Sequence, residues 1–387
     1  MITTPLQVLM FSDKGCTLSD DYREVATVAF QGGGTGYLSG STDTGVPIRE
    51  FFAVPDTSVT DLLKGAQKSL ILIFLSKTLL QNKEMVANLN KLLSRRTRPN
   101  FQILIFDLEQ QKNALLKRAP AFDPNDIIDV LGLGEYALRR TAVGLIALHI
   151  GVGILSKGSK RITKKPKFFV SHAKIDGQSL ATVLRTQIKD LPGFQTFYDD
   201  DDISEGDDLK QVLSNGVENS VLIVLRSEVF EDRPWCLQEM HWAEEYASPY
   251  VVVDLRQKAI TPPSAVSFER APTVKVADGN LYRIVFIALR EALRSRIHIR
   301  IVEDLAARGI TKTKGLHILV RQPTMRCLHK ICSDLKPGEE TTIVYPDPSM
   351  TEGDRAAAEA LVRSMSAKSL ITTPQTLVLD CATRRAS

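Results

Sequence analysis

The sequence predicts an α/β protein with several domains, each built on a parallel sheet that helices cover on both faces. The chain has 387 residues, which is enough for two or three domains at roughly 100–200 residues each. Apolar residues make up 43% of it and charged residues 24%, as in ordinary globular proteins. Short apolar runs alternate with segments of helical periodicity, and such runs are typical of parallel strands buried on both faces.

The first part of the chain, residues 1–156, shows this alternation together with a loop rich in Gly, Ser and Thr at residues 32–45. Strands are expected at residues 6–11, 70–75 and 101–106, and helices at residues 20–30, 59–68 and 83–94. These elements predict an α/β domain over residues 1–156.

An apolar segment that contains several glycines, residues 142–155, closes this domain. Its length of roughly 14 residues falls short of the roughly 20 that a helix needs to cross a bilayer. We therefore expect a helix buried in the protein rather than a membrane-associated segment.

A basic run follows, most of it in residues 157–166, formed by Lys157, Lys160, Arg161, Lys164, Lys165 and Lys167. We expect a solvated linker here, with a patch for phosphate or lipid as the alternative. The formal net charge of the whole chain is only +4, which is not the signature of a nucleic-acid-binding protein. No nucleic-acid partner is expected.

The cysteines and the N-terminus both indicate a cytoplasmic protein. Five cysteines are scattered along the chain without the spacing of a disulfide framework, which fits a reducing compartment. The first residues also lack the basic and apolar regions of a secretory signal.

The central part, residues 167–299, repeats the α/β alternation. Strands are expected at residues 167–171, 194–198, 221–225 and 250–254, and helices at residues 178–189, 207–217, 234–246 and 281–296. A second domain with a parallel sheet is therefore predicted.

The last part, residues 300–387, is shorter and can bury only a modest core. Strands are expected at residues 317–320, 342–345 and 377–379, and helices at residues 325–335 and 352–365. We predict a small α/β module that packs on one of the larger domains.

The first two domains match each other when one is shifted by 151 positions, so that Gly65 meets Gly216 and Ser76 meets Ser227. Both then have a helix, an apolar strand that ends near Ser, another helix and a strand that ends in Asp-Leu. This indicates an internal repeat, with a chance match between two α/β domains as the alternative.

The strongest functional signal is the pair Trp235 and Glu239, which follows an acidic loop at residues 198–207. Four residues apart, the two side chains lie near one face of the helix predicted at residues 234–246. The ring could stack on a base while the carboxylate binds a ribose. The alternatives are a packing role for Trp235 and, for Glu239, a solvated acid in the first helical turn.

Other chemistry is not supported by the sequence. The glycines at residues 32–36 follow a helix and precede no Gly-Lys-Ser/Thr, so they form no phosphate-binding loop. Cys327, His329 and Cys332 would not share a helix face, and the acidic loop lacks the spacing of an EF-hand. No metal site is expected. Cys236 and His241 point to different sides of one helix, which argues against a nucleophile pair.

Residues 167–299 resemble the TIR domain family through four pieces in the family's order. These are Phe-Phe-Val-Ser-His at 168–172 with Asp176, the acidic stretch 197–207, the segment 217–227 around the third strand, and Trp-Cys-Leu-Gln-Glu-Met at 235–240. The resemblance implies a flavodoxin-like parallel sheet with flanking helices. It would be preceded by a degenerate TIR-like domain, in which Glu84 and Asn88 stand opposite Trp235 and Glu239, and followed by the small α/β module.

Many TIR domains of this kind cleave NAD, so the resemblance implies Glu239 as the catalytic residue and Trp235 as the residue that stacks on the substrate. It also implies five residues around the substrate cleft: Ser171, His172, Ile203, Gly206 and Ser227. The loop His172-Ala173-Lys174 differs from the Arg-Gly-Glu of plant members, and Arg226 stands where a small or apolar residue is commoner.

The function implied is that of an NAD glycohydrolase, with NAD as substrate and no cofactor. It would release nicotinamide together with ADP-ribose or a cyclic ADP-ribose-type product. The resemblance further suggests a role in bacterial antiviral defence and immune signalling, with self-association through TIR domains and an unidentified trigger ligand or protein. The alternative is a non-enzymatic adaptor that acts through contacts between TIR domains.

Overall fold

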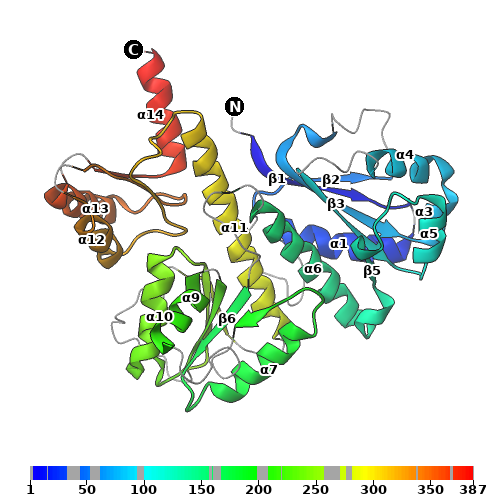
Figure 1. The fold of residues 1–387 in the computed structure, drawn as a ribbon, viewed down its shortest axis with the longest axis horizontal. Helices are drawn as coiled ribbons and strands as arrows, with labels where there is room; N and C mark the ends of the chain where they lie inside the picture. The colour runs from blue at the N-terminus through cyan, green and yellow to red at the C-terminus, as the bar shows by residue number, and fades with distance from the viewer. Residues whose placement is uncertain are drawn as a thin grey trace.

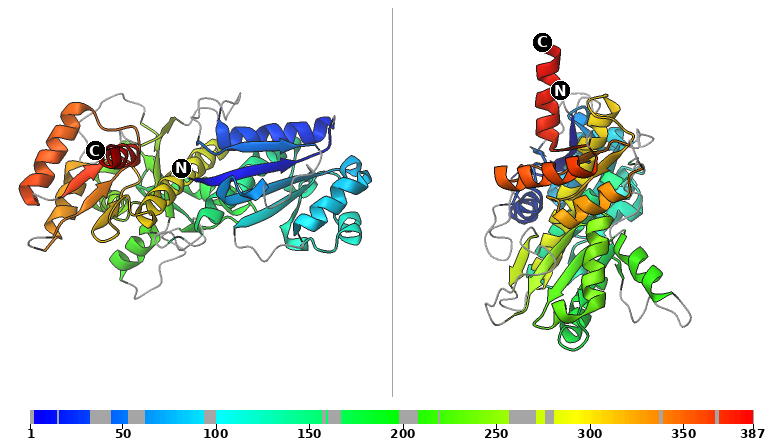
Figure 2. Two further views of the ribbon diagram at one scale, coloured as in Figure 1. Left: turned by 90° about the horizontal axis from the view of Figure 1, so that it is seen from above. Right: turned by 90° about the vertical axis from the view of Figure 1, so that its left-hand side faces the viewer.

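The computed structural model has three parallel sheets flanked by helices (Figure 1), and it confirms the predicted α/β class. It describes residues 3–14, 16–32, 44–52, 62–93, 100–156, 159, 167–197, 208–218, 220–256, 271–275, 281–336, 339–366 and 369–386. The N-terminal domain, coloured blue to cyan, and the C-terminal module, coloured orange to red, lie at opposite ends of the molecule's long axis (Figures 1 and 2). The central domain, in green, lies between them along that axis.

The N-terminal sheet has five strands in the order β2-β1-β3-β4-β5, with every neighbouring pair parallel. The strands are β1 (Thr4–Phe11), β2 (Ile48–Phe51), β3 (Ala66–Leu75), β4 (Phe101–Asp107) and β5 (Ile127–Asp129). The helices are α1 (Thr17–Gln31), α3 (Lys77–Gln81), α4 (Lys83–Leu93), α5 (Lys112–Arg118) and α6 (Tyr136–Ser156). Short β2 and β5 lie at the two edges, and the sequence pattern did not predict them.

Alternation along the strands divides the buried residues of this sheet between two faces. Leu70 and Leu72 of β3 pack toward α1 and α6. Ile71 and Ile73 pack toward α3, α4 and α5. Because helices cover both faces of the sheet, the side chains on both sides of β3 are apolar over residues 70–75. This part of the strand is therefore one continuous apolar run in the sequence.

The central sheet has the order β10-β9-β8-β6-β7, again all parallel. The strands are β6 (Lys167–His172), β7 (Thr196–Phe197), β8 (Ser220–Arg226), β9 (Tyr250–Asp254) and β10 (Thr273–Lys275). The helices are α7 (Gln178–Lys189), α9 (Leu209–Glu218), α10 (Pro234–Glu245) and α11 (Tyr282–Ala307). Of the predicted strand 194–198, Thr196–Phe197 form β7 and Tyr198 lies outside the described residues. Strand β10 was not predicted.

The two sheets share one topology. If the strands of each domain are counted from its own start, both orders read 2-1-3-4-5, which is the flavodoxin-like order. A matching hydrogen bond joins the loop after the first strand to the end of the third. Ser76 Oγ donates to Asp13 Oδ1 at 2.8 Å, and Ser227 Oγ donates to Asp176 Oδ1 at 2.7 Å. The serines of the two pairs, Ser76 and Ser227, correspond in the register predicted from the sequence, whereas Asp13 and Asp176 do not. The common origin of the domains stays a prediction.

Helix α11 packs against α6 and so joins the central domain to the N-terminal domain. Arg290 of α11 is buried, and its Nη1 donates to the carbonyl oxygens of Val28 and Ala29, each at 3.0 Å. Both carbonyls lie in the last turn of α1. Carbonyls in the last turn of a helix carry partial negative charge, and the cation is stabilised there, although the Val28 carbonyl also accepts a hydrogen bond from Gly32 N–H.

The end of α6 is held in the same way. Arg296 Nη1 donates to the carbonyl of Val152 at 2.7 Å, and Arg300 Nε donates to that of Leu155 at 2.9 Å. Burial lowers the pKa of Arg296 to about 10, which still leaves the guanidinium charged at neutral pH. Three arginines of one helix thus cap the C-termini of two helices in the other domain.

Helix α6 is the described helix that is long and apolar enough to span a membrane by length and composition. However, 72% of its apolar window is buried inside the protein. Gly144 and Gly151 let it approach α1 closely, because a Cβ at either position would lie 2.9 Å from Val25 or Phe30. The structure therefore uses this segment as a core helix, as predicted, but the helix has 21 residues rather than the roughly 14 from which that prediction was argued.

The C-terminal module has a three-stranded sheet in the order β11-β12-β13, formed by Leu316–Ile318, Thr342–Val344 and Leu370–Thr372. Helices α12 (Met325–Ser333) and α13 (Glu352–Met365) cover one face, and α11 with α14 (Pro374–Ala386) covers the other. The strand predicted at residues 377–379 is wrong, because these residues lie within α14. The third strand is instead β13.

Two further boundaries differ from the predictions. The helix predicted at residues 59–68 is wrong at its end, because residues 66–68 belong to β3; residues 59–61 lie outside the described residues. Helix α11 continues to Ala307 rather than ending near residue 296. The division predicted between residues 299 and 300 therefore falls within a continuous helix.

Candidate functional site

A cleft of about 1000 Å³ opens at the carboxyl end of β6. It is lined by residues 172–175 of the loop after β6, by Leu209 and Leu213 of α9, and by residues 233–236 and 239 at the start of α10. The carboxyl ends of parallel strands are where ligands bind in open α/β sheets. The volume is in the range of clefts that hold small molecules, roughly 300–1,000 Å³.

Glu239 lines this cleft and is only 5% exposed. It lies on α10, where Pro234 occupies the first turn and the same turn has no acidic residue. The interpretation of Glu239 as a solvated acid in the first helical turn is therefore wrong. Its Oε2 accepts a hydrogen bond of 2.5 Å from Ser171 Oγ at the end of β6, which fixes the orientation of the carboxylate.

Trp235 lines the same cleft and is 45% exposed, in contrast to Trp242 of the same helix, which is buried. Trp235 and Glu239 lie four residues apart, so one helix face presents both to the cleft. A large ring left exposed at a cleft wall offers a flat apolar surface for a planar ligand. The ring is therefore not part of the buried core, and its stacking on a substrate stays a prediction.

The other predicted site residues divide into two groups. His172 lines the cleft, and its carbonyl accepts a hydrogen bond from Cys236 Sγ at 3.5 Å. Ser171 and Ser227 are buried and do not line the cleft. Ser171 instead holds Glu239, and Ser227 holds Asp176 in the loop after β6. Ile203 and Gly206, with the acidic loop 198–207, lie outside the described residues.

Two cations in the cleft wall were not singled out from the sequence as site residues. Lys174 and Arg233 line the cleft and are exposed. They come from the loop after β6 and from the residue before α10, so they flank the buried acid from two elements. Neither position belongs to a spacing motif, and only the fold brings them together.

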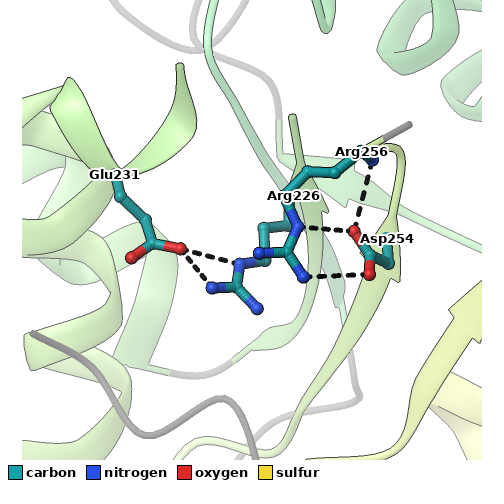
Figure 3. A network of polar contacts seen from close by, with 4 residues as sticks. All are labelled: Arg226, Glu231, Asp254 and Arg256. Carbon is teal, nitrogen blue, oxygen red and sulfur yellow. Dashed lines mark hydrogen bonds and ion pairs between the residues drawn. The ribbon is translucent and has the colours of Figure 1, made fainter. Parts of the chain in front are cut away.

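Arg226, which departs from the family pattern, is explained by its partner. Its Nε donates to Glu231 Oε1 at 2.8 Å (Figure 3), and Glu231 lies in the short turn between β8 and α10. The pair therefore holds the segment that leads to Arg233 and Trp235. Arg226 is buried, as expected for a cation with a carboxylate partner.

A second ion pair lies beside it at the end of β9 (Figure 3). Arg256 Nε and Nη2 donate to Asp254 Oδ1 and Oδ2 at 2.8 and 3.0 Å. These side-chain hydrogen bonds hold the pKa of Asp254 below its ordinary value, although partial burial acts in the opposite direction. Two charges of each sign thus compensate one another at the carboxyl ends of β8 and β9.

No group of three or more His, Cys, Asp or Glu side chains is placed to hold a metal ion in the part of the chain that the structure describes. Cys327 and Cys332 lie on α12, and burial raises the pKa of Cys327 to about 12. A partly buried thiol that stays protonated at neutral pH is a poor metal ligand.

Comparison with known families gives one finding. The family model for the TIR domain matches residues 168–279, which covers β6 to β10, α10 and the cleft. No curated protein matches the chain. The domain thus has the fold that the sequence resemblance implied, namely a parallel flavodoxin-like sheet with helices on both faces.

Proposed function

We propose that the TIR domain of this chain is an NAD glycohydrolase, with Glu239 as its catalytic residue. The TIR family has signalling roles and includes NAD-cleaving enzymes, and TIR domains generally self-associate. The observation that carries the proposal is the position of Glu239. Its carboxylate is 5% exposed and lines a cleft of about 1000 Å³ together with the exposed ring of Trp235.

One carboxylate is sufficient for this reaction. The bond between nicotinamide and ribose breaks with both electrons going to the pyridine nitrogen, so nicotinamide leaves as a neutral molecule and needs no proton. Positive charge develops on the sugar, as in glycoside hydrolysis. A buried carboxylate stabilises that charge more strongly than a solvated one, because the surroundings screen it less.

After this step a nucleophile adds to the sugar cation. Water gives ADP-ribose and releases one proton, and an internal nitrogen of the adenine gives a cyclic product. Both outcomes use the same first step and the same role for Glu239.

Other residues of the cleft fit the remaining parts of NAD. The ring of Trp235 offers a surface for stacking on a base. Lys174 and Arg233 are placed to attract the diphosphate, because both are exposed cations in the cleft wall. Ser171 orients the acid through its 2.5 Å hydrogen bond and does not touch the substrate in this scheme.

We further propose that the enzyme acts in the cytoplasm in an immune signalling or antiviral defence role, and that self-association activates it. This part rests on the family alone. The acidic loop 198–207, the surface predicted for TIR contacts, lies outside the described residues.

The test is nicotinamide release from NAD by the purified chain, measured by chromatography at high protein concentration. Glu239→Gln removes the charge while keeping the shape, and it should abolish release. Glu245→Gln is the matched control, because Glu245 is an exposed acid on the same helix, and it should retain full activity. A non-enzymatic adaptor predicts no release from the parent protein, even when it is clustered.

A further inference from the structure

A second cavity, of about 620 Å³, lies where the three parts of the molecule meet. Helix α11 lines it with Glu291, Arg294, Ser295 and His298. The C-terminal module contributes residues 320–322, 346–348 and Pro374. The N-terminal domain contributes Thr44, and the central domain contributes residues just before β10. This cavity shares no described lining residue with the cleft that holds Glu239.

The cavity lies at the carboxyl ends of all three strands of the C-terminal sheet, because residues 320–322, 346–348 and 374 follow β11, β12 and β13 in turn. The chain leaves β12 toward α13, which packs on the face formed by Ile343 and Ile371. It leaves β13 toward α14, which packs with α11 on the face of Val344. Adjacent parallel strands whose connections leave to opposite faces open a crevice at their carboxyl ends, and ligands of open α/β sheets bind there.

The walls of this crevice carry both apolar surface and charge. Pro346 and Pro348 flank the exposed carboxylate of Asp347 on the side of the sheet. Arg294, also exposed, lines the cavity from α11. Glu291 and Arg321 also line the cavity, but they lie 3.7 Å apart as an ion pair and largely neutralise each other.

His298 adds a neutral polar group to the same wall. It is 6% exposed, and burial lowers its pKa to about 4, with the backbone of Val344 and Leu319 offsetting part of that shift. At neutral pH the charged groups of the described lining are therefore Glu291, Arg294, Arg321 and Asp347. A guanidinium attracts phosphate, and a carboxylate at a strand end accepts hydrogen bonds from ribose hydroxyls.

We propose that this cavity binds a ribonucleoside monophosphate, with the phosphate at Arg294, the ribose hydroxyls at Asp347 and the base along the prolines. The volume lies within the roughly 300–1,000 Å³ of small-molecule sites. Such a ligand would contact residues of all three parts at once. It would also lie against Arg321, whose guanidinium carbon is 3.4 Å from the centre of the Tyr250 ring at the start of β9. The site is separate from NAD cleavage and does not depend on the function proposed for the TIR domain.

The experiment is isothermal titration calorimetry on the full chain with Glu239→Gln, so that catalysis does not interfere. The probes are AMP, GMP, CMP and UMP. At least one should bind saturably with a Kd below about 1 mM. Arg294→Ala and Asp347→Asn should each weaken that binding by about tenfold or more, the loss expected for a hydrogen bond to a charged group. Arg363→Ala is the matched control, because Arg363 is an exposed arginine on α13 outside the cavity lining, and it should bind like the parent.

A nucleoside monophosphate is also a fragment of NAD, so binding in the catalytic cleft must be distinguished. Trp235→Ala should leave the binding unchanged if the nucleotide occupies the junction cavity. The proposal is overturned by absence of binding for all four probes. It is equally overturned by binding that survives both cavity variants, or by binding that Trp235→Ala abolishes while the cavity variants keep it. Melting temperatures confirm that each variant is folded.

Discussion

Glu239 depends on a neighbour that the sequence assigned to a different role. Ser171 was expected at the rim of the cleft, but it is 1% exposed and donates its hydroxyl to the Glu239 carboxylate. The two residues lie 68 positions apart, and only the pairing of β6 with β8 and the packing of α10 bring them together. Spacing within a motif identified the acid, but it carried no information about what orients the acid.

Replacing Ser171 by Ala should therefore lower kcat for NAD cleavage and leave KM nearly unchanged. The loss should be about tenfold to a hundredfold, because a hydrogen bond to a charged group contributes about 1.5–3 kcal/mol. Steady-state kinetics would measure both constants. Ser220→Ala serves as control, because Ser220 is a buried serine of the neighbouring strand β8. Its hydroxyl donates to the carbonyl oxygen of Gly216. A raised KM with normal kcat would instead place Ser171 in contact with substrate, as the resemblance implied.

A single buried residue, His298, should make the stability of the protein depend on pH. Burial lowers its pKa to about 4, whereas an unfolded chain has a His pKa of about 6.5. Between these values the unfolded state binds a proton that the folded state does not, so stability falls as pH falls through this window. Above about pH 6.5 the contribution is complete.

Urea unfolding should detect this effect. Between about pH 7.5 and about pH 5, His298 should account for a loss of about 2 kcal/mol in the free energy of unfolding. His298→Gln should remove that part of the pH dependence. An unchanged slope in the variant would show that His298 is accessible to protons in the folded protein.

Among the elements, α11 departs most from its sequence-based prediction. Its arginines alternate with apolar residues in the sequence, yet Arg290, Arg296 and Arg300 are buried. Amphipathic patterning assigns charged residues to solvent, and it does not account for the C-terminal carbonyls of neighbouring helices as partners. The same tertiary contacts explain why α11 continues beyond residue 296, because Val302 and Leu305 pack against the C-terminal sheet.

Arg290→Ala should lower the free energy of unfolding by about 1–3 kcal/mol, because it leaves the carbonyls of Val28 and Ala29 buried without this donor. Arg294→Ala on the same helix removes an exposed arginine and should change stability by about 0.5 kcal/mol at most. Denaturant unfolding of both variants compares them directly. Equal effects would contradict a specific capping role for Arg290.

Elements at sheet edges and in the small module were predicted least well. Residues 377–379, Leu-Val-Leu, read as a strand because a short apolar run does not distinguish a strand from a helix turn. In the structure these residues belong to a helix, because α14 begins at Pro374 and continues to Ala386. The strands β2, β5 and β10 have only three or four residues each, too few for a period to show. By contrast, α7, β9 and α13 match their predicted ranges. Each shows a complete helical period or a complete apolar run in the sequence.

At the scale of the whole molecule, the N-terminal and central domains share one core. A single cluster of buried residues extends from Leu70 and Leu148 in the first domain to Val170 and Leu289 in the second. We expect one calorimetric unfolding transition for these two domains, because separating them would expose the faces of α6 and α11 to water. Two well-separated transitions in scanning calorimetry, neither of them assignable to the C-terminal module, would contradict this expectation.

The distance along the chain between the residues of a site determines whether the sequence could reveal that site. The pair Trp235 and Glu239 lies within one helix turn and was visible as a motif. The cleft cations Lys174 and Arg233, and the whole junction cavity, are formed by segments far apart in the chain. No local pattern predicts which loops meet, so these features required the fold.

The central claim is that the Glu239 carboxylate stabilises a sugar cation as nicotinamide leaves. The most direct measurement is the amount of nicotinamide released from NAD by the parent chain and by Glu239→Gln, with both proteins shown to have the same melting temperature. The account predicts release by the parent and none above background by the variant. Equal release by the two proteins would contradict it.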